Sequence, residues 1–391
     1  MFRLCLPACM KVVIVLNTVW NVVNFRSGLI RALVAAGYDV LVVAPPDGYV
    51  TRLATLGCRY VPMNMDNQGT HPVRDLLLVF RLIKLFMRER PDVFLGYTVK
   101  PNVYGSLAAY VVGVPVVNNV AGLGSVFIDD SSLTSLVRFL YRLAFFRSRE
   151  VFFQNDEDRR HFIKGGLVRS ATAERLPGSG VDLKKFFFQP SVPAGKRCKF
   201  RFLLIARMLW DKGVAEFVEA ARLIQERWPE AECCLLGFVD VPSPSSIPLS
   251  QINQWVAEGS VRYLGESDDV CSEIAMADCI VLPSFYREGV PHSLLESAAV
   301  GRPLITTDTD GCRDAVEDGK NGFLCKPRDA QDLAEKMERM LLLTEEERHA
   351  MALYGRKKME RQFDEKIVIQ KYMEVIESIK REGKARRAAC Q

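Results

Sequence analysis

The sequence has no apolar run long enough to cross a bilayer, which takes roughly 18 or more consecutive apolar residues. We therefore expect no transmembrane helix. The first residues, MFRLCLPACMKVVIVL, weakly resemble a signal peptide, but Lys11 interrupts the apolar stretch and KVVIVL is typical of a buried strand. Met10 is an alternative start, in which case residues 1–9 are not native.

Histidine is also scarce. None of the 4 histidines has an evident Asp or Ser partner, so we expect no catalytic triad. The 11 cysteines show no paired zinc-ligand spacing, and Cys233, Cys234 and Cys279 are typical of buried, reduced thiols in a cytosolic protein. No Gly-x-Gly-x-x-Gly follows the first strand, which argues against a dinucleotide-dependent oxidoreductase.

Neither sign of charge is in large excess, since the net charge is +5 over 391 residues. The positive excess lies in residues 1–190, whereas the remainder is slightly acidic. A basic first half indicates an anionic partner, either a phosphate-bearing substrate or a lipid surface. We do not expect nucleic acid to be a partner. Ordinary scatter of charge is the alternative.

What the sequence does contain is a repeated alternation of short apolar runs and longer amphipathic ones, typical of parallel α/β sheets. The length favours two domains. The alternation pauses at 176–200, which is rich in Pro and Gly. We therefore predict a first domain over 1–190, a second over 191–362, and a helix with a basic tail over 363–391 that returns to the first. Strands are expected near 11–16, 38–44, 92–96, 115–120, 150–154, 200–206, 232–237, 261–264, 279–283 and 303–307.

Two glutamates, Glu288 and Glu296, lie eight positions apart in REGVPHSLLESAAVGRPLI, where Pro291 opens a predicted helix. The N-terminus of a helix attracts phosphate through its free N–H groups. With a diphosphate at the amides of Gly289 and Val290, the two carboxylates could accept hydrogen bonds from rings on either side of it. The alternative is a solvated helix face.

A second motif, IARMLWDKGVAEFVEAARLI at 205–224, has Arg207 and Lys212 between a predicted strand and a predicted helix. Two cations there could offset the charge that develops on a diphosphate leaving group. Two surface cations with no function are the alternative.

These two stretches, together with PGSGVD and GYTVKPNVYGSLAAYVVGVPVVNNVAGLG, resemble the family 4 glycosyltransferases of GT-B fold over nearly the whole chain. The first half is most similar to bacterial enzymes of capsule, O-antigen and N-linked glycan assembly, which act on polyprenyl-diphosphate-linked acceptors. The resemblance implies two Rossmann-like, doubly wound domains facing a cleft. It also implies retention of anomeric configuration and no metal or other cofactor.

The resemblance further implies roles for individual residues. Arg207 and Lys212 match the diphosphate-binding pair, and Glu288 matches the glutamate that contacts the donor sugar. Glu296 matches the glutamate on the ribose, and Gly289–Val290 matches the turn that contacts phosphate. The catalytic set implied is therefore Glu288, Arg207 and Lys212.

The acceptor side of the site departs from the family pattern. The loop expected after the first strand, NTVWNVVNFRSG at 17–28, lacks the Gly-Gly pair of many members. A lysine in GYTVKPN stands where many members have a histidine. The acceptor-binding candidates are Asn24, Phe25, Arg26, Ser27, Gly28 and Lys100.

Asp308 and Asp310 in TTDTDG form an Asp-x-Asp pattern, which holds a divalent metal in a different glycosyltransferase fold. That fold has one central sheet, so we interpret the pattern as a turn and expect no metal.

Two predicted helices, 75–90 and 135–150, combine arginines with large apolar residues and are candidates for peripheral binding to a membrane. The alternative is that each packs its apolar stripe on the sheet. We expect the first helix to be core. The second, with Phe139, Tyr141, Phe145 and Phe146, is the better bilayer candidate.

The function predicted is transfer of a sugar from a UDP-sugar to a polyprenyl-diphosphate-linked saccharide, by a cytoplasmic enzyme on the inner face of the cytoplasmic membrane. The sequence places no side chain well enough for us to name it as the general base. A nucleotide-sugar epimerase on the same fold, a transferase acting on a soluble or lipopolysaccharide-core acceptor, and a non-catalytic scaffold are the alternatives.

Overall fold

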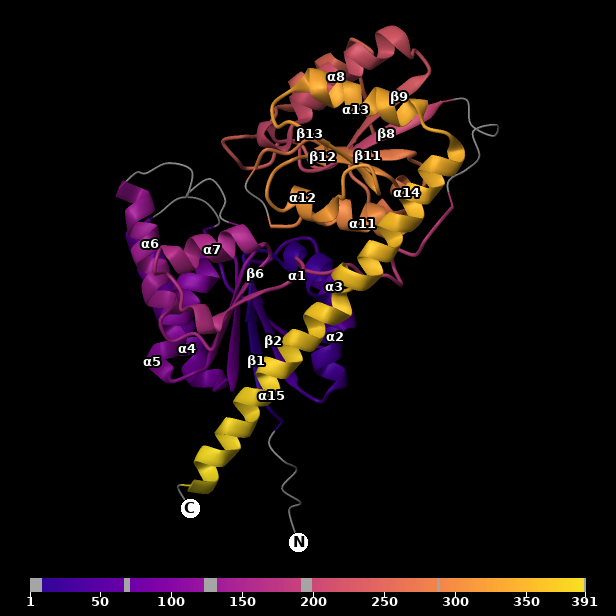
Figure 1. The fold of residues 1–391 in the computed structure, drawn as a ribbon. Helices are drawn as coiled ribbons and strands as arrows, with labels where there is room; N and C mark the ends of the chain where they lie inside the picture. The colour runs from indigo at the N-terminus through magenta and orange to yellow at the C-terminus, as the bar shows by residue number, and fades with distance from the viewer. Residues whose placement is uncertain (1–8, 67–70, 123–131, 191–198, 287–288, 390–391) are drawn as a thin grey trace. The chain divides into compact units, whose positions relative to one another are not determined.

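The computed structural model describes residues 9–66, 71–122, 132–190, 199–286 and 289–389. The chain forms two compact units, each built on one parallel sheet (Figure 1). Unit 1 is Met1–Ser179 with Lys366–Gln391, and unit 2 is Gly180–Glu365. The predicted α/β class with two Rossmann-like domains is confirmed.

The sheet of unit 1 has seven parallel strands in the order β3-β2-β1-β4-β5-β6-β7. The strands are β1 (Lys11–Val15), β2 (Asp39–Ala44), β3 (Arg59–Pro62), β4 (Val93–Tyr97), β5 (Val116–Val120), β6 (Glu150–Phe153) and β7 (Ala173–Arg175). The helices are α1 (Val19–Phe25), α2 (Ser27–Ala35), α3 (Val50–Leu53), η1 (Ala54–Leu56), α4 (Pro72–Glu89), the π-helix η2 (Pro101–Gly105), α5 (Ser106–Val112), α6 (Ser132–Phe145), α7 (Asp156–Lys164), η4 (Ser170–Thr172) and α15 (Glu365–Ala389).

Helices cover both faces of this sheet because its inner strands are apolar on both sides. Val12 and Ile14 of β1 pack with α1, α2 and α15, whereas Val13 and Val15 pack with α4 and α5. The helix α6 packs further along the second face, with α7. Figure 1 shows α4, α5 and α6 on one side of the sheet and α2, α3 and α15 on the other.

The sheet of unit 2 has six parallel strands in the order β10-β9-β8-β11-β12-β13. The strands are β8 (Phe200–Ile205), β9 (Ala231–Leu236), β10 (Arg262–Tyr263), β11 (Cys279–Leu282), β12 (Leu304–Thr307) and β13 (Gly322–Cys325). The helices are η6 (Trp210–Lys212), α8 (Val214–Arg227), α9 (Leu249–Ala257), α10 (Val270–Ala275), α11 (His292–Val300), α12 (Cys312–Ala315), α13 (Ala330–Leu342), α14 (Glu345–Lys358) and the π-helix η7 (Met359–Phe363).

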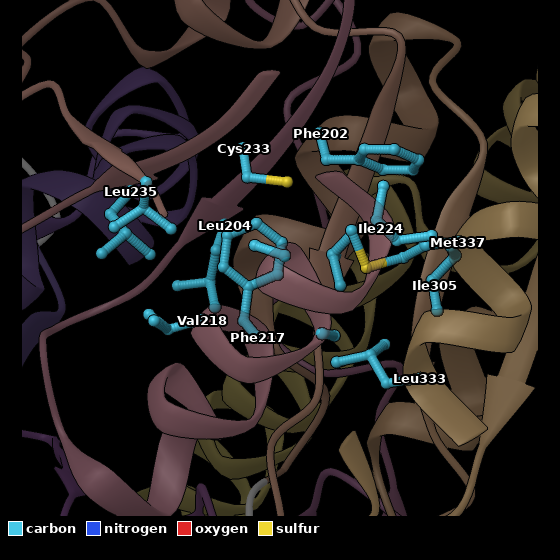
Figure 2. Close-up of a cluster of buried hydrophobic side chains, with 14 of the residues drawn as sticks. Phe202, Leu204, Phe217, Val218, Ile224, Cys233, Leu235, Ile305, Leu333 and Met337 are labelled. Atoms are coloured by element: carbon cyan, nitrogen blue, oxygen red, sulfur yellow. The ribbon is translucent and has the colours of Figure 1, made fainter. Parts of the chain in front are cut away.

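One core of unit 2 lies between this sheet and the helices α8 and α13. Figure 2 shows Phe202 of β8, Phe217 of α8 and Met337 of α13 among its buried side chains. Cys233 belongs to this core, and burial raises the pKa of its thiol. The eight described cysteines are free, and Cys233, Cys234 and Cys279 are buried as expected.

The two units divide at Ser179/Gly180 and Glu365/Lys366, rather than after residues 190 and 362. Residues 181–189 pair with unit 2, because Val181 N–H donates to the Phe363 carbonyl at 2.8 Å and Gln189 N–H to that of Val300 at 3.0 Å. Gly180 has a left-handed φ of 73°, and a Cβ there would stand 2.4 Å from the Glu365 Cα. The first domain boundary inferred from composition, after residue 190, therefore lies later in the chain than the structural boundary at Ser179/Gly180.

The last helix, α15, packs on the sheet of unit 1. Val368, Tyr372, Ile376 and Ile379 recur at helical spacing and are buried in the unit 1 core. The Tyr372 hydroxyl accepts a hydrogen bond from Asn119 Nδ2 at 3.1 Å, and its ring lies 4.9 Å from that of Phe152. The C-terminal helix thus completes the first domain rather than the second.

A pH effect on stability is expected beside α15. Burial, with the neighbouring Glu174, raises the pKa of Glu150 to about 7, and Lys371 of α15 opposes the shift. Because the folded pKa lies above the unfolded one, ionised Glu150 costs stability, and this cost grows as pH rises from about 4.5 to 7. We expect Glu150→Gln to raise the Tm by a few degrees at pH 8, corresponding to about 1 kcal/mol after discounting for solvent.

Thermal melts followed by circular dichroism at about pH 8 and about pH 4.5 test this expectation. Glu335→Gln, at an exposed carboxylate of α13, is the control and should change the Tm little at either pH. An equal change in Tm at both pH values for Glu150→Gln would contradict the assigned titration.

Candidate active site

The direction of strand order in unit 2 reverses between β8 and β11. From β8 the chain moves outward through β9 to β10, and then returns to β11 on the other side. Ligands of open α/β sheets bind at such a point, outside the carboxyl ends of the strands. Residues 206–213 follow β8 and residues 283–286 follow β11, so both sequence motifs meet at this edge.

The first loop carries the two predicted cations in different surroundings. Arg207 is exposed and pairs with none of the described carboxylates. Lys212 ends η6 and is buried, with its Nζ 5.3 Å from the centre of the Tyr286 ring. An ammonium over an aromatic face makes a cation–π contact, and charge interactions are stronger at a buried site of low dielectric than in water.

The two loops are joined by hydrogen bonds to one carbonyl. The Phe285 and Tyr286 N–H groups each donate to the Asp211 carbonyl at 3.1 Å, and Ser284 Oγ donates to it at 3.3 Å. Gly213 has a left-handed φ of 75°, and a Cβ there would stand 2.1 Å from the Pro283 carbonyl oxygen. The loop of Lys212 therefore lies directly against the loop that leads to α11.

The helix α11 begins at His292, directly after Pro291, whose φ of −61° suits entry into a helix. Leu294 N–H donates to the Pro291 carbonyl at 3.1 Å, so the amides before it precede the intrahelical bonds and can bind an anion. Gly289 and Val290 are buried just before this end. The other predicted residue of this turn, Glu288, lies outside the described residues.

Glu296 lies inside α11 and has a partner that the sequence interpretation missed. His292 Nδ1 and Glu296 Oε1 are 3.0 Å apart, and both side chains are 17% exposed. The sequence analysis considered only Asp or Ser as histidine partners, so it did not include this pair with a glutamate. The contact is made by one carboxylate oxygen of Glu296, Oε1.

Asp308 and Asp310 follow β12, as predicted. Both pair with Arg313, Asp308 through Nε and Asp310 through Nη1 at 3.6 Å. Among the described residues, no group of three or more His, Cys, Asp or Glu could hold a metal ion.

In unit 1 most of the segment 17–28 is helical, in α1 and at the start of α2, so the prediction of a loop is wrong. The helix α1 is capped by Thr18, whose Oγ1 accepts from Asn21 N–H at 3.1 Å, and α2 follows after Arg26. Asn24 and Phe25 belong to α1. Capping and the apolar spacing of residues 19–23 made a helix favourable.

The remaining acceptor candidates are partly committed to the fold. Ser27 Oγ donates to the Val23 carbonyl at 2.5 Å, and Gly28 is part of α2. Arg26 is buried, with its guanidinium 4.3 Å from the centre of the Tyr97 ring. Its Nε has no hydrogen-bond partner in the part of the chain that the structure describes.

Lys100 lies at the carboxyl edge of the unit 1 sheet, three residues after the end of β4. Its Nζ pairs with Asp75 at 2.7 Å, and Tyr104 donates its hydroxyl to the same carboxylate at 2.9 Å. Thr98, which lies between the end of β4 and Lys100, has a left-handed φ of 63°, which is uncommon for a residue other than glycine. The ammonium is thus held in one place beside the turn.

Three residues of these surroundings were not predicted from the sequence. The i,i+4 spacing of His292 and Glu296 on a predicted helix was a usable signal. No local signal marks Asp75, which is far from Lys100 in the chain, or Tyr286, whose contact with Lys212 depends on strand order.

Comparisons with known proteins agree with this architecture. A model described as "Glycosyl transferase 4-like domain" matches residues 22–178, and one described as "Glycosyl transferases group 1" matches residues 189–358. Among solved structures, Anabaena HepE in complex with UDP and glucose has a TM-score of 0.78 at 20% identity, covering 94% of this chain and 100% of that one. At that identity the likeness shows the fold.

Two curated relatives are similar over most of their length. The Campylobacter jejuni N,N'-diacetylbacillosaminyl-diphospho-undecaprenol alpha-1,3-N-acetylgalactosaminyltransferase is 31% identical over 376 residues, covering 92% of this chain and 96% of that protein. The Escherichia coli UDP-Gal:alpha-D-GlcNAc-diphosphoundecaprenol alpha-1,3-galactosyltransferase is 27% identical over 273 residues, covering 66% and 68%. The chain therefore belongs to the family 4 glycosyltransferases of GT-B fold and is an enzyme that transfers a glycosyl group.

Proposed function

We propose that the chain transfers a sugar, an N-acetylhexosamine or a hexose, from a UDP-sugar to a saccharide carried on a polyprenyl diphosphate. The product would be an intermediate of a cell-surface polysaccharide or glycan. One observation carries the donor side of this proposal: the loop of Arg207 and Lys212 is hydrogen-bonded to the loop that enters α11, at the switch point of the unit 2 sheet.

The donor would bind with its diphosphate between the two loops. Lys212 and Arg207 contribute positive charge, and the amides before Leu294 contribute donors at the positive end of the helix dipole. Glu288 would accept hydrogen bonds from the sugar hydroxyls and Glu296 from the ribose. Each carboxylate then recognises a ring on its own side of the diphosphate.

The acceptor proposal rests on relatives. The two enzymes from C. jejuni and E. coli both carry a diphospho-undecaprenol acceptor in their names, and the first covers nearly the whole chain. Arg26 and Lys100, both cations at the carboxyl edge of the unit 1 sheet, are the candidates for the acceptor phosphates. We place the enzyme at the inner face of the cytoplasmic membrane as a peripheral protein.

We propose that transfer retains the anomeric configuration and needs no metal. The bond between the anomeric carbon and the diphosphate oxygen breaks as the acceptor hydroxyl adds on the same face. The leaving phosphate takes the hydroxyl proton, so no side chain has to act as the base. Arg207 and Lys212 stabilise the charge on the departing diphosphate.

A panel of UDP-sugars incubated with the purified chain and a membrane lipid extract tests the proposal. We expect one donor to add the mass of one sugar residue to a polyprenyl-linked lipid, with the same yield in excess chelator. Formation of an epimer from the donor alone would indicate an epimerase instead. Transfer only to a water-soluble or lipopolysaccharide-core acceptor would overturn the acceptor proposal and keep the donor site.

A further inference from the structure

Exposed apolar side chains are distributed unevenly over unit 1. Among its described residues, every large apolar side chain that is exposed lies between Val73 and Phe146, and all but Val99 lie on the helices α4 and α5 or on α6 and the residue that follows it. They are Val73, Leu76, Leu77, Phe80, Met87, Val111, Leu136, Phe139, Leu143 and Phe146. Among the side chains that the structure describes, those of the helices on the opposite face of the sheet contribute none.

The helix α6 shows the pattern most clearly. Leu136, Phe139, Leu143 and Phe146 recur at i, i+3, i+7 and i+10 and point away from the sheet, with exposed fractions of 44–70%. Tyr141 and Phe145, which the sequence assigned to the bilayer face, are buried in the core instead. The apolar stripe at the surface is therefore a second one, additional to the stripe that packs on the sheet.

The helix α4 carries a similar double pattern, which corrects the expectation that it is only core. Leu78, Leu82 and Phe86 are buried against the sheet, whereas Leu77 and Phe80 are exposed on the other side of the helix. The helix α5 packs against both α4 and α6, so the three helices form one layer (Figure 1). We call the outer surface of α4 and α6 the apolar–basic face.

Cations predominate among the charged side chains of the apolar–basic face. Its exposed cations are Arg74, which pairs with Asp66 at 3.3 Å, and Arg81, Lys84, Arg88, Arg142 and Arg147. The described residues 132–149 contain no Asp or Glu, and both acidic residues of α4 are paired with cations. Asp75 is bound by Lys100 and Tyr104, and Glu89 by Lys11 and Arg59 as well as by Arg88.

We propose that the apolar–basic face docks on the surface of an anionic phospholipid bilayer. Leucine and phenylalanine side chains would enter the boundary between headgroups and acyl chains, while the arginines bind lipid phosphates. A second copy of the chain is a poorer occupant, because a symmetric contact would bring these like charges together. Exposed apolar side chains that cluster on one surface and are accompanied by charged ones are typical of an interaction site.

The inference rests on the proposed function in one respect, because an acceptor on a polyprenyl chain is held in a membrane. It goes further by naming the surface, two helices and their outward side chains, and the lipid charge that it requires. Its test uses vesicles without acceptor or donor, so docking and sugar transfer can fail separately.

The experiment is co-sedimentation of the full chain with vesicles of phosphatidylcholine alone or mixed with phosphatidylglycerol. We expect binding to be at least about tenfold stronger with phosphatidylglycerol, and weaker in roughly 1 M salt than in roughly 0.1 M. The double variant Phe139→Ser/Phe146→Ser should lose about tenfold or more of this binding. The control is Leu342→Ser on α13, an apolar residue of similar exposure at 66%.

Charge is tested separately with Arg81→Glu/Arg142→Glu, against Lys357→Glu on α14 as control. Unchanged Tm values would show that the variants fold, as expected for exposed residues. The proposal is overturned if the parent chain binds neither vesicle, or binds both equally, or if the face variants bind like the controls. It is also overturned if the parent chain is a dimer and the Phe139→Ser/Phe146→Ser variant is a monomer, since the face would then be an interface between two copies.

Discussion

We expect the Glu288→Ala variant to transfer no measurable sugar, with kcat reduced by more than about a thousandfold. The carboxylate is proposed to hold the hydroxyls of the donor sugar, and these charge-assisted bonds position the anomeric carbon. In the chain it follows Tyr286 by two residues and precedes Pro291 by three. Its described neighbours thus connect it both to the buried Lys212 and to the start of α11.

The measurement is the initial rate of product formation, together with UDP affinity by calorimetry. The affinity for UDP should stay within about threefold of that of the parent chain, because the variant loses a contact to the donor sugar and none to the nucleotide. Glu335→Ala, on the exposed side of α13, is the matched control and should transfer normally. Full turnover by the Glu288→Ala variant would remove the site assignment.

The second large effect is expected at the cationic loop. Lys212→Met should lower kcat/KM by about 30- to 1,000-fold, corresponding to about 2–4 kcal/mol of barrier. Methionine can fill much of the space beside Tyr286, so the substitution removes the charge more than the packing. Arg207→Ala should have an effect of the same size, although its side chain is exposed and lacks that packing role.

Two readouts separate charge from folding here. The Tm of Arg207→Ala should equal that of the parent chain, and Lys357→Ala on α14 should leave the rate unchanged. UDP should bind more weakly to both variants, because the diphosphate loses a partner in the ground state as well. Normal kcat/KM for Lys212→Met with intact UDP binding would refute a role for this loop in stabilising the leaving group.

The inner strands were predictable because each is apolar on both faces. KVVIVL and FRFLLIA correspond to β1 and β8 within a residue or two, and their neighbours follow the same rule. Three of the four edge strands, β3, β7 and β13, were not predicted, whereas β10 was. A short strand that pairs on one side only needs few apolar residues, as RYVP of β3 shows, and leaves a weak pattern.

The prediction of a loop at 17–28 was wrong for a different reason. A family pattern with glycines was expected there, and the local signals of a helix were given less weight. Thr18 as a cap and Val19, Val22 and Val23 at helical spacing already indicated α1. Its residues Asn24 and Phe25 are therefore presented from a helix, not from a flexible loop.

The sequence alone determined that the chain has two parallel sheets, where their inner strands lie, and which cations and carboxylates follow them. Those properties are local, since burial on both faces and capping leave a pattern within a few neighbouring residues. Only the tertiary structure decided that Asp211 and Gly213 lie against Pro283–Tyr286, because this contact depends on β8 and β11 being neighbours in the sheet. It alone decided also which apolar stripe of α4 and of α6 stays exposed, since each helix has two such stripes and one sheet to pack on.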